Sequence, residues 1–234
     1  MHTPFFYEEN LSEDPLLILS EETSKHVAQV LRIKIGENIH LTNGKGEIHL
    51  AEIIDSNKKS TTTKIISRHK IPPPVHKITI AISPVKNTNR FEWFFEKATE
   101  IGVSRIIPLV CERTEKQYLK MDRIKKILIS AMLQSKQAWL PDLYEPTQFS
   151  NLISTSEYDQ KFIAHCEDDD KTMLQDYTSS SDAIILIGPE GDFTPQEIDA
   201  AIFNNFVPVS LGNNRLRTET AGIVAAVLLN RMPL

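Results

Sequence analysis

Two glycine-containing turns in the last third of the chain constrain its fold more than any other feature. The first turn, residues 188–191, follows the apolar and β-prone run 183–187. The second turn, residues 211–218, follows a similar run at 207–211. Each turn leads into an expected helix, so both place backbone N–H groups at the carboxyl edge of a sheet, where open α/β folds bind ligands. We therefore expect the functional site at this edge.

The region after Pro72-Pro73-Pro74 alternates between strand and helix patterns. Apolar runs predict strands at 78–83, 105–111, 161–165, 183–187 and 207–211. Helical spacing and capping signals predict helices at 87–101, 122–138, 194–204 and 218–231. This order predicts an α/β domain with a mostly parallel sheet and helices on both faces.

The first 70 residues instead indicate a small β-rich domain. Alternating segments at 38–42 and 48–54 flank Asn43-Gly44-Lys45-Gly46, which is a hairpin signal, and residues 24–31 have a short helical pattern. The three prolines that follow cannot continue a helix or a central strand. We therefore predict two domains, at residues 1–71 and 75–234.

The charge is unevenly distributed along the chain, whose formal net charge is −5. Residues 64–136 carry 15 Lys and Arg against 6 Asp and Glu, whereas residues 137–234 carry 5 against 15. A basic middle segment favours a polyanionic partner, but ordinary solvated helices can have the same composition. Both interpretations stay open on composition alone.

Several other classes of protein are disfavoured by the sequence. It shows no signal-peptide pattern, and its longest apolar run, 221–229, is far below the roughly 20 residues that span a bilayer, so we expect a cytoplasmic protein without membrane attachment. The histidines show no metal-ligand spacing, and Cys111 and Cys166, which follow apolar runs, are expected to be buried thiols. Dinucleotide-binding, phosphate-loop and nucleophile-elbow motifs are missing from the sequence.

The motifs that remain carry a family resemblance over nearly the whole chain. The C-terminal pair Gly188-Pro189-Glu190-Gly191 and Leu216-Arg217-Thr218-Glu219-Thr220-Ala221 resembles the SPOUT class of methyltransferases. The chain is more closely similar to the bacterial family that methylates N3 of a uridine in small-subunit ribosomal RNA. The further segments that match this family are 26–32 with Gly36, Lys86, Arg90, 96–103, Pro108, 112–113, 134–135 and 140–141.

Three positions depart from the family pattern. Asp192 stands where a second glycine is usual, and Leu133 and Gln137 replace a common glutamate and arginine. The departures at Leu133 and Gln137 weaken any catalytic role for the middle helix, but they lie outside the two turns.

The resemblance implies a SPOUT domain with a deep trefoil knot, an exception to the rule against threaded chains, preceded by a PUA-like RNA-binding β-barrel. It also implies S-adenosylmethionine as cofactor, 16S rRNA on the assembled small ribosomal subunit as substrate, and a homodimer formed through the knot domain. The implied cofactor-binding residues are His165, Ile187, Gly188, Pro189, Glu190, Gly191, Leu211, Gly212, Asn214, Leu216, Arg217 and Thr218. No metal is implied.

The chemistry of this reaction suggests catalytic roles for Arg217, Glu190 and Glu219. Uracil N3 becomes a nucleophile only after losing its proton, and a cation near O2 and O4 stabilises the resulting anion. Arg217 is our candidate for this cation; Glu190, Glu219, His165 or a water molecule would accept the proton. The alternatives are that Arg217 braces the knot, that these carboxylates and the histidine are structural, and that the Gly188–Gly191 segment is only a tight turn.

Six basic residues are candidates for RNA contact: His26, Arg32, Lys86, Arg90, Lys97 and Arg113. The alternative for each is a solvated charge. Phe91, Phe94 and Phe95 lie at helical spacing and are expected in the core. Two other functions remain open: a ribose 2′-O-methyltransferase of the same class, and an RNA-binding assembly factor without catalysis.

Overall fold

The computed structural model describes residues 3–167, 171–177 and 181–230. Its contacts divide the chain into two units. The first unit contains the residues up to Pro73 together with Met132–Leu140, and the second contains Pro74–Ala131 and the residues from Pro141 onward. The predicted domains, residues 1–71 and 75–234, are divided differently from these two units, and their bounds stay a prediction. In the described part of the chain, no helix has the length and apolar character needed to cross a membrane.

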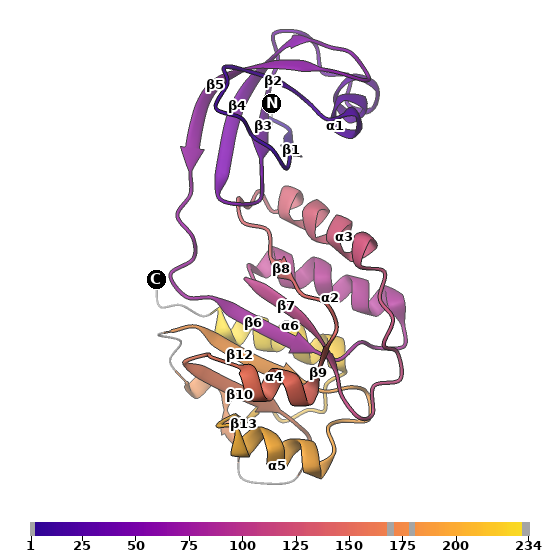
Figure 1. The fold of residues 1–234 in the computed structure, drawn as a ribbon, viewed down its shortest axis with the longest axis vertical. Helices are drawn as coiled ribbons and strands as arrows, with labels where there is room; N and C mark the ends of the chain where they lie inside the picture. The colour runs from indigo at the N-terminus through magenta and orange to yellow at the C-terminus, as the bar shows by residue number, and fades with distance from the viewer. Residues whose placement is uncertain (1–2, 168–170, 178–180, 231–234) are drawn as a thin grey trace. The chain divides into compact units, whose positions relative to one another are not determined.

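The first unit is built on a curled, mixed five-stranded sheet (Figure 1). Its strands are β1 (Phe5–Tyr7), β2 (Leu16–Ile18), β3 (Asn38–Thr42), β4 (Glu47–Asp55) and β5 (Thr62–Lys70), in the order β1-β3-β4-β5-β2. The pair β1 and β3 is parallel and the other pairs are antiparallel. The hairpin predicted around residues 43–46 is confirmed. The predicted helical segment forms α1 (Glu21–Lys25) and a π-helical turn (His26–Val30).

The segment Met132–Leu140 completes the first unit by packing on the β3–β4 hairpin. Trp139 lies so close to Gly46 that a Cβ there would come within 2.5 Å of the indole ring. The Gly46 N–H donates to the Ala138 carbonyl at 2.9 Å. The helix α3 (Met121–Gln134) therefore ends earlier than the predicted 138, because Lys136 takes a φ of 56° and turns the chain toward the hairpin.

The second unit contains a parallel sheet in the order β11-β13-β10-β12-β6-β7-β8, with β9 paired to β7. All of its pairings are parallel, and β6 and β12 are buried along their whole length because helices cover both faces. This confirms the predicted α/β class. The strand bounds are β6 (Ile78–Ile82), β7 (Arg105–Val110), β8 (Asp142–Leu143), β9 (Thr147–Gln148), β10 (Gln160–Ala164), β11 (Thr172–Met173), β12 (Ala183–Ile187) and β13 (Val207–Ser210).

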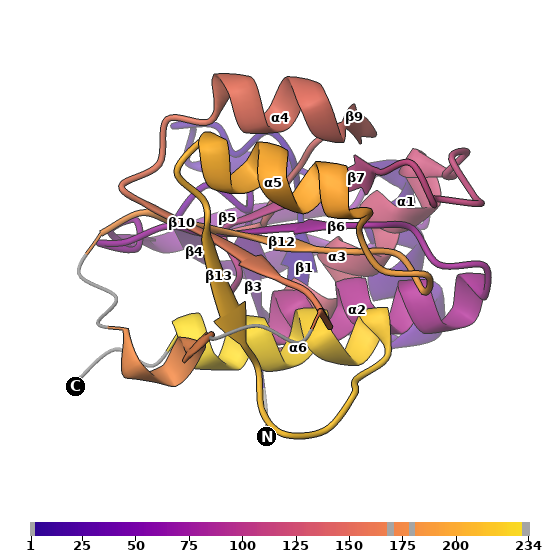
Figure 2. The same ribbon diagram turned by 90° about the horizontal axis from the view of Figure 1, so that it is seen from below.

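The helices of the second unit form one layer on each face of this sheet (Figure 2). Helices α2 (Thr88–Ile101) and α6 (Thr218–Leu229) lie on one face, and α4 (Phe149–Thr155) and α5 (Pro195–Phe203) lie on the other. Asn87 caps the start of α2, and Gly102 ends it with a φ of 95°. The predicted capping box of Thr194 and Glu197 opens α5. The prediction that the last helix reaches residue 231 extends beyond the described residues.

Helix α6 packs closely on α2, β6 and β12. A Cβ at Gly222 would lie 2.7 Å from the Phe94 ring and 2.8 Å from Ile82 Cδ1, so this position needs glycine at the present spacing. Phe91, Phe94 and Phe95 are buried, as predicted. Since β13 lies beyond β10, the segment 211–217 must return across the carboxyl edge of the sheet before α6 begins. The trefoil knot stays a prediction.

Candidate functional site

A cavity of about 380 Å³ lies at the carboxyl edge of the parallel sheet. It is formed where β10 and β12 end and where α6 begins, so the two turns singled out in the sequence meet there. Its described lining residues are Ala164, Cys166, Ile187, Gly188, Pro189, Glu190, Asp192, Arg215, Leu216, Arg217, Thr218 and Ala221. We call this space the loop cavity.

A buried hydrogen bond joins the two turns. The Thr218 hydroxyl at the start of α6 donates to the Gly188 carbonyl at 3.0 Å, and both residues are buried. Gly188 is also restricted in size, because a Cβ there would lie 3.1 Å from the Phe193 ring. The sequence positions 188 and 218, which are far apart along the chain, are thus held together beside the loop cavity.

Asp192 fastens the first turn to the end of β10. Its carboxylate accepts hydrogen bonds from the Cys166 N–H at 2.7 Å and from the Phe193 N–H at 2.8 Å. Asp192 has a φ of 64°, which is the left-handed region where glycine is favoured and Asp is tolerated when its side chain bonds locally. Aspartate is therefore compatible with the backbone of this turn.

Arg113, which follows the end of β7, supports the same turn. Its guanidinium donates to the Gly191 carbonyl at 2.8 Å and to the Phe193 carbonyl at 3.3 Å. The preceding residue is also fixed, since the Glu112 N–H donates to the Glu197 carboxylate at 2.8 Å. Arg113 was predicted to contact RNA; the structure gives it contacts with the first turn and the residue that follows it, and its RNA role stays a prediction.

The structure brings seven of the predicted cofactor residues to the loop cavity: Ile187, Gly188, Pro189, Glu190, Leu216, Arg217 and Thr218. The other five, His165, Gly191, Leu211, Gly212 and Asn214, are not among the described lining residues. Sequence reasoning missed Ala164, Cys166, Asp192, Arg215 and Ala221. The carboxyl-edge rule could have indicated Ala164 and Cys166, because they end a strand that pairs with β12.

The three candidate proton acceptors have different surroundings. Glu190 is exposed and lines the loop cavity, and its carboxylate accepts from the Lys86 N–H at 3.4 Å. Glu219 is 6% exposed and lies 3.8 Å from the Arg90 guanidinium. His165 is buried, with Lys171 Nζ 3.4 Å from its Nδ1. Of the three, only Glu190 belongs to the described lining.

The two cysteines differ in exposure. Cys111 is buried, as predicted, and burial raises the pKa of its thiol. The prediction was wrong for Cys166, which is exposed because it follows the end of β10 and faces the loop cavity. Partial burial and then the charge of Asp192 raise the pKa of the Cys166 thiol. Among the described residues, no group of three or more His, Cys, Asp or Glu could hold a metal ion.

Three of the cations predicted to bind RNA already have carboxylate partners. Lys86 lies 2.5 Å from Glu115, and Arg90 pairs with Glu219. Lys97 lies 2.8 Å from Glu96 and 3.0 Å from Glu100 on its own helix. The exposed pairs of Lys86 and Lys97 are weak, so they lower the charge offered to a phosphate without fixing these two side chains. RNA contact by these residues stays a prediction.

The two candidates in the first unit lie at the π-helical turn and just after it. His26 is exposed and packs edge-on against Phe6, with ring centroids 5.6 Å apart. Arg32 is exposed and has a φ of 53°. Their RNA roles also stay predictions.

Comparison with known proteins identifies the family. Residues 72–230 match the family described as an RNA methyltransferase domain, and residues 19–66 match an RNA methyltransferase PUA domain. The chain belongs to this RNA methyltransferase family.

Its relatives share the complete two-part architecture. The ribosomal RNA small subunit methyltransferase E of Rickettsia conorii is 28% identical over 92% of this chain and 89% of its own length. The crystal structure of the enzyme of that name from Neisseria gonorrhoeae, bound to S-adenosylmethionine, is 30% identical with a TM-score of 0.85, covering 96% of this chain and 95% of that one. A "probable rRNA-methyltransferase" from Porphyromonas gingivalis is 36% identical with a TM-score of 0.89, covering 95% of each chain. The likeness confirms the expected RNA methyltransferase fold with a PUA-like first unit.

Proposed function

We propose that this RNA methyltransferase transfers a methyl group from S-adenosylmethionine to N3 of a uridine in 16S rRNA. The observation that carries the proposal is a full-length likeness to a small-subunit methyltransferase solved with this cofactor, combined with the loop cavity at the carboxyl edge of the sheet. The basic segment 64–136 supports a polyanionic substrate.

The residues of the loop cavity fit S-adenosylmethionine. Its volume of about 380 Å³ is within the roughly 300–1,000 Å³ of small-molecule sites, and Ile187, Leu216 and Ala221 supply apolar surface for an adenine ring. The lining contains the carboxylates Glu190 and Asp192 and the cations Arg215 and Arg217, so it offers groups of both signs to a cofactor that carries a sulfonium, an ammonium and a carboxylate. We assign cofactor binding to the seven lining residues among those predicted, and to His165, Gly191, Leu211, Gly212 and Asn214 as supporting backbone.

The cofactor supplies an activated methyl group, and the protein must position and ionise the uridine. The in-line displacement needs the reacting atoms roughly 3–3.5 Å apart, and the base must leave its stack to reach a recessed methyl group. We assign Arg217, an exposed cation of the cavity lining, to stabilising the uracil anion at O2 and O4.

The proton acceptor that best fits the described geometry is Glu190. It lines the loop cavity, whereas Glu219 is buried beside Arg90 and His165 lies outside the described lining. Glu219 then serves as a structural carboxylate at the start of α6, where the helix dipole favours negative charge.

The remaining parts of the proposal concern assembly and location. We propose a homodimer formed through the knotted C-terminal domain, action on the assembled small subunit, and a cytoplasmic location. The exposed Val227 on α6 offers apolar surface for a second copy. His26, Arg32, Lys86, Arg90, Lys97 and Arg113 remain the proposed RNA contacts. The ion pairs of Lys86, Arg90 and Lys97 would be exchanged for phosphates on binding.

The deciding experiment is methyl transfer from labelled S-adenosylmethionine to small ribosomal subunits that lack this modification. Digestion to nucleosides and mass spectrometry would then identify the product. We expect 3-methyluridine. A ribose-methylated nucleoside would overturn the target atom, and cofactor binding without any product would favour the non-catalytic assembly factor. Naked 16S rRNA serves as the comparison substrate for the assembled subunit.

A further inference from the structure

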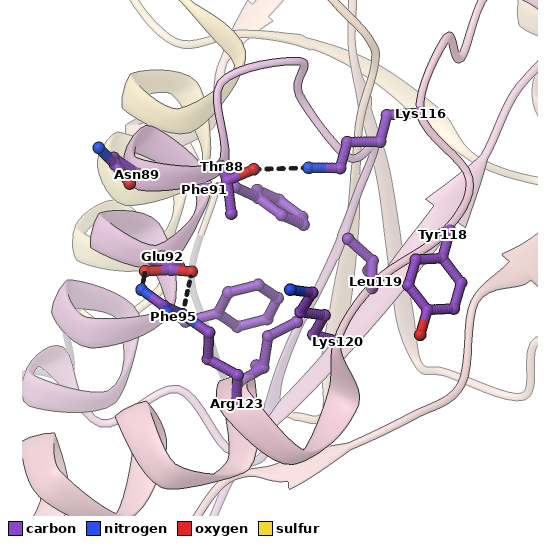
Figure 3. A pocket seen from close by; sticks show the side chains of 11 residues that line it. Thr88, Asn89, Phe91, Glu92, Phe95, Lys116, Tyr118, Leu119, Lys120 and Arg123 are labelled. Atoms are coloured by element: carbon purple, nitrogen blue, oxygen red, sulfur yellow. Dashed lines mark hydrogen bonds and ion pairs between the residues drawn. The ribbon is translucent and has the colours of Figure 1, made fainter.

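A second pocket lies on the second unit, between the first turns of α2 and the segment 116–124 (Figure 3). It has a volume of about 270 Å³. Its described lining residues are Thr88, Asn89, Phe91, Glu92, Phe95, Lys116, Tyr118, Leu119, Lys120, Arg123 and Ile124. We call it the α2 pocket.

The α2 pocket has an apolar inner wall and an exposed aromatic rim. Phe91 and Phe95 of α2 lie on one side, and Leu119 and Tyr118 lie on the other. The phenylalanines are buried, whereas Tyr118 is 77% exposed. An aromatic ring that is this exposed beside an apolar pocket gains little from packing within the chain, and it presents a face on which a planar ligand can stack.

The charges around the α2 pocket leave two lysines without a carboxylate partner. Arg123 donates to both oxygens of Glu92, at 2.6 and 2.8 Å, so these two charges neutralise each other. Lys116 donates to the neutral Thr88 hydroxyl at 2.6 Å. In the part of the chain that the structure describes, the Lys120 ammonium group has no hydrogen-bond or ion-pair partner. The pocket therefore differs from the neighbouring Lys86, Arg90 and Lys97, whose charges are paired.

The α2 pocket continues into an adjoining hollow. The hollow measures about 590 Å³ and shares Tyr118, Leu119, Lys120 and Arg123 with it. Acidic groups, Asp122 and Glu145, belong only to this second part. An extended chain can therefore pass from the pocket into the hollow along the Tyr118 rim.

The α2 pocket and the loop cavity lie at the same edge of the sheet. Strand β6 pairs in parallel with β12 on one side and β7 on the other, so the segments that follow all three strands emerge at one edge. The loop cavity follows β12, whereas the α2 pocket follows β6 and β7. The hydrogen bond from the Lys86 N–H to Glu190 directly links the two segments.

We propose that the α2 pocket binds an unpaired nucleotide of the substrate RNA close to the methylated uridine. The base stacks on Tyr118, and Lys116 and Lys120 bind the flanking phosphates. Aromatic platforms beside cationic grooves bind single-stranded nucleic acid in this way, with little dependence on base identity. The proposal rests on the proposed function, since it supplies a binding site for the same RNA.

The test compares two variants with two matched controls. Tyr118→Ala removes the platform, whereas Tyr118→Phe keeps the ring. Lys116→Ala with Lys120→Ala removes the two unpaired charges; Lys125→Ala with Lys126→Ala removes two exposed charges of α3 outside both hollows. The readouts are binding of a fluorescent single-stranded oligouridine at several salt concentrations, KM and kcat on unmodified small subunits, and the S-adenosylmethionine Kd.

We expect Tyr118→Ala to weaken oligouridine binding roughly ten-fold, the scale on which one base–aromatic stack acts, and Tyr118→Phe to retain it. The Lys116/Lys120 variant should lower the salt slope by about 1.4, which corresponds to two phosphates of a single strand. Both should raise KM for the subunit with the cofactor Kd unchanged.

Unchanged oligouridine affinity in both pocket variants would overturn the proposal. An equal loss of affinity in the Lys125/Lys126 control and the Lys116/Lys120 variant would also overturn it, because the effect would then come from the total positive charge and not from the pocket. A changed cofactor Kd would also overturn it by indicating damage to the fold. The oligouridine measurement does not depend on catalysis. Failure of wild-type methyl transfer would therefore reject the proposed function separately.

Discussion

The hydrogen bond between Thr218 and Gly188 offers a direct test of how the loop cavity is held. Thr218→Val keeps the size and β-branching of the side chain but leaves the buried Gly188 carbonyl without this donor. An unsatisfied buried carbonyl costs about 1–3 kcal/mol. Thr218→Ser is the matched control, because it retains the hydroxyl and loses one methyl group, worth about 0.8 kcal/mol.

Urea unfolding and calorimetric titration with S-adenosylmethionine measure the two expected consequences. The valine variant should lose about 1–3 kcal/mol of unfolding free energy. Because the bond joins both walls of the loop cavity, cofactor affinity should fall as well. The expected loss is about ten-fold for each 1.4 kcal/mol of free energy that the variant must spend to bring the two turns together before the cofactor binds. If the valine and serine variants had equal stability and equal affinity, the reasoning would be refuted.

Three further predictions concern the loop cavity. Arg217→Ala should reduce kcat far more than cofactor affinity, since its charge acts on the uracil anion; equal losses would contradict that role. Arg113→Ala should weaken S-adenosylmethionine binding about ten-fold by releasing the carbonyls of Gly191 and Phe193, and, because Arg113 is also a proposed phosphate contact, it should lower the salt slope of RNA binding by about 0.7. An unchanged slope would contradict the phosphate contact and leave this arginine with the turn alone. The Cys166 thiol, whose pKa is raised, should react with iodoacetamide more slowly at pH 7.5 than a free cysteine of pKa about 8.5. Its reactivity should increase as the pH rises, and bound cofactor should protect it. Fast alkylation at neutral pH would contradict this prediction.

The helices that local signals specify were predicted well. Asn87 and Gly102 cap the two ends of α2, and Thr194 with Glu197 caps the start of α5, so residues close in sequence specify each of these ends. The strands β8, β9 and β11 contain two residues each and exist only through their pairing with β7 or β13. No local pattern could have indicated them. Helix α4 was not predicted either, because Gln148 before its first residue makes no side-chain capping hydrogen bond and gives no capping signal in the sequence.

The site was predictable where the motif itself lines the cavity, as at Gly188 and Thr218. It was not predictable where the partner is distant in sequence. Arg113 reaches the Gly191 carbonyl 78 positions away, and Arg90 pairs with Glu219. A basic residue has the same appearance in the sequence whether it meets a phosphate, a carboxylate or a carbonyl, so only the fold distinguishes these roles.

Asp192 shows how aspartate can satisfy a backbone conformation at a position where the family usually has glycine. The turn requires a left-handed backbone, and aspartate meets this requirement because its carboxylate bonds the adjacent N–H groups. Leu133 and Gln137, the other departures, belong to the segment that joins the first unit and are not among the described lining of the loop cavity.

The grouping of Met132–Leu140 with the N-terminal sheet means that the chain passes between the two units three times. A protease that cuts only at the triple proline would therefore give two polypeptides, and the longer one would still carry Met132–Leu140, a part of the first unit. A gene fragment that ends at residue 71 would encode a barrel lacking Trp139, the ring that lies against Gly46. Exchange of the first unit between members of this family would therefore require transplanting two stretches of sequence, not one.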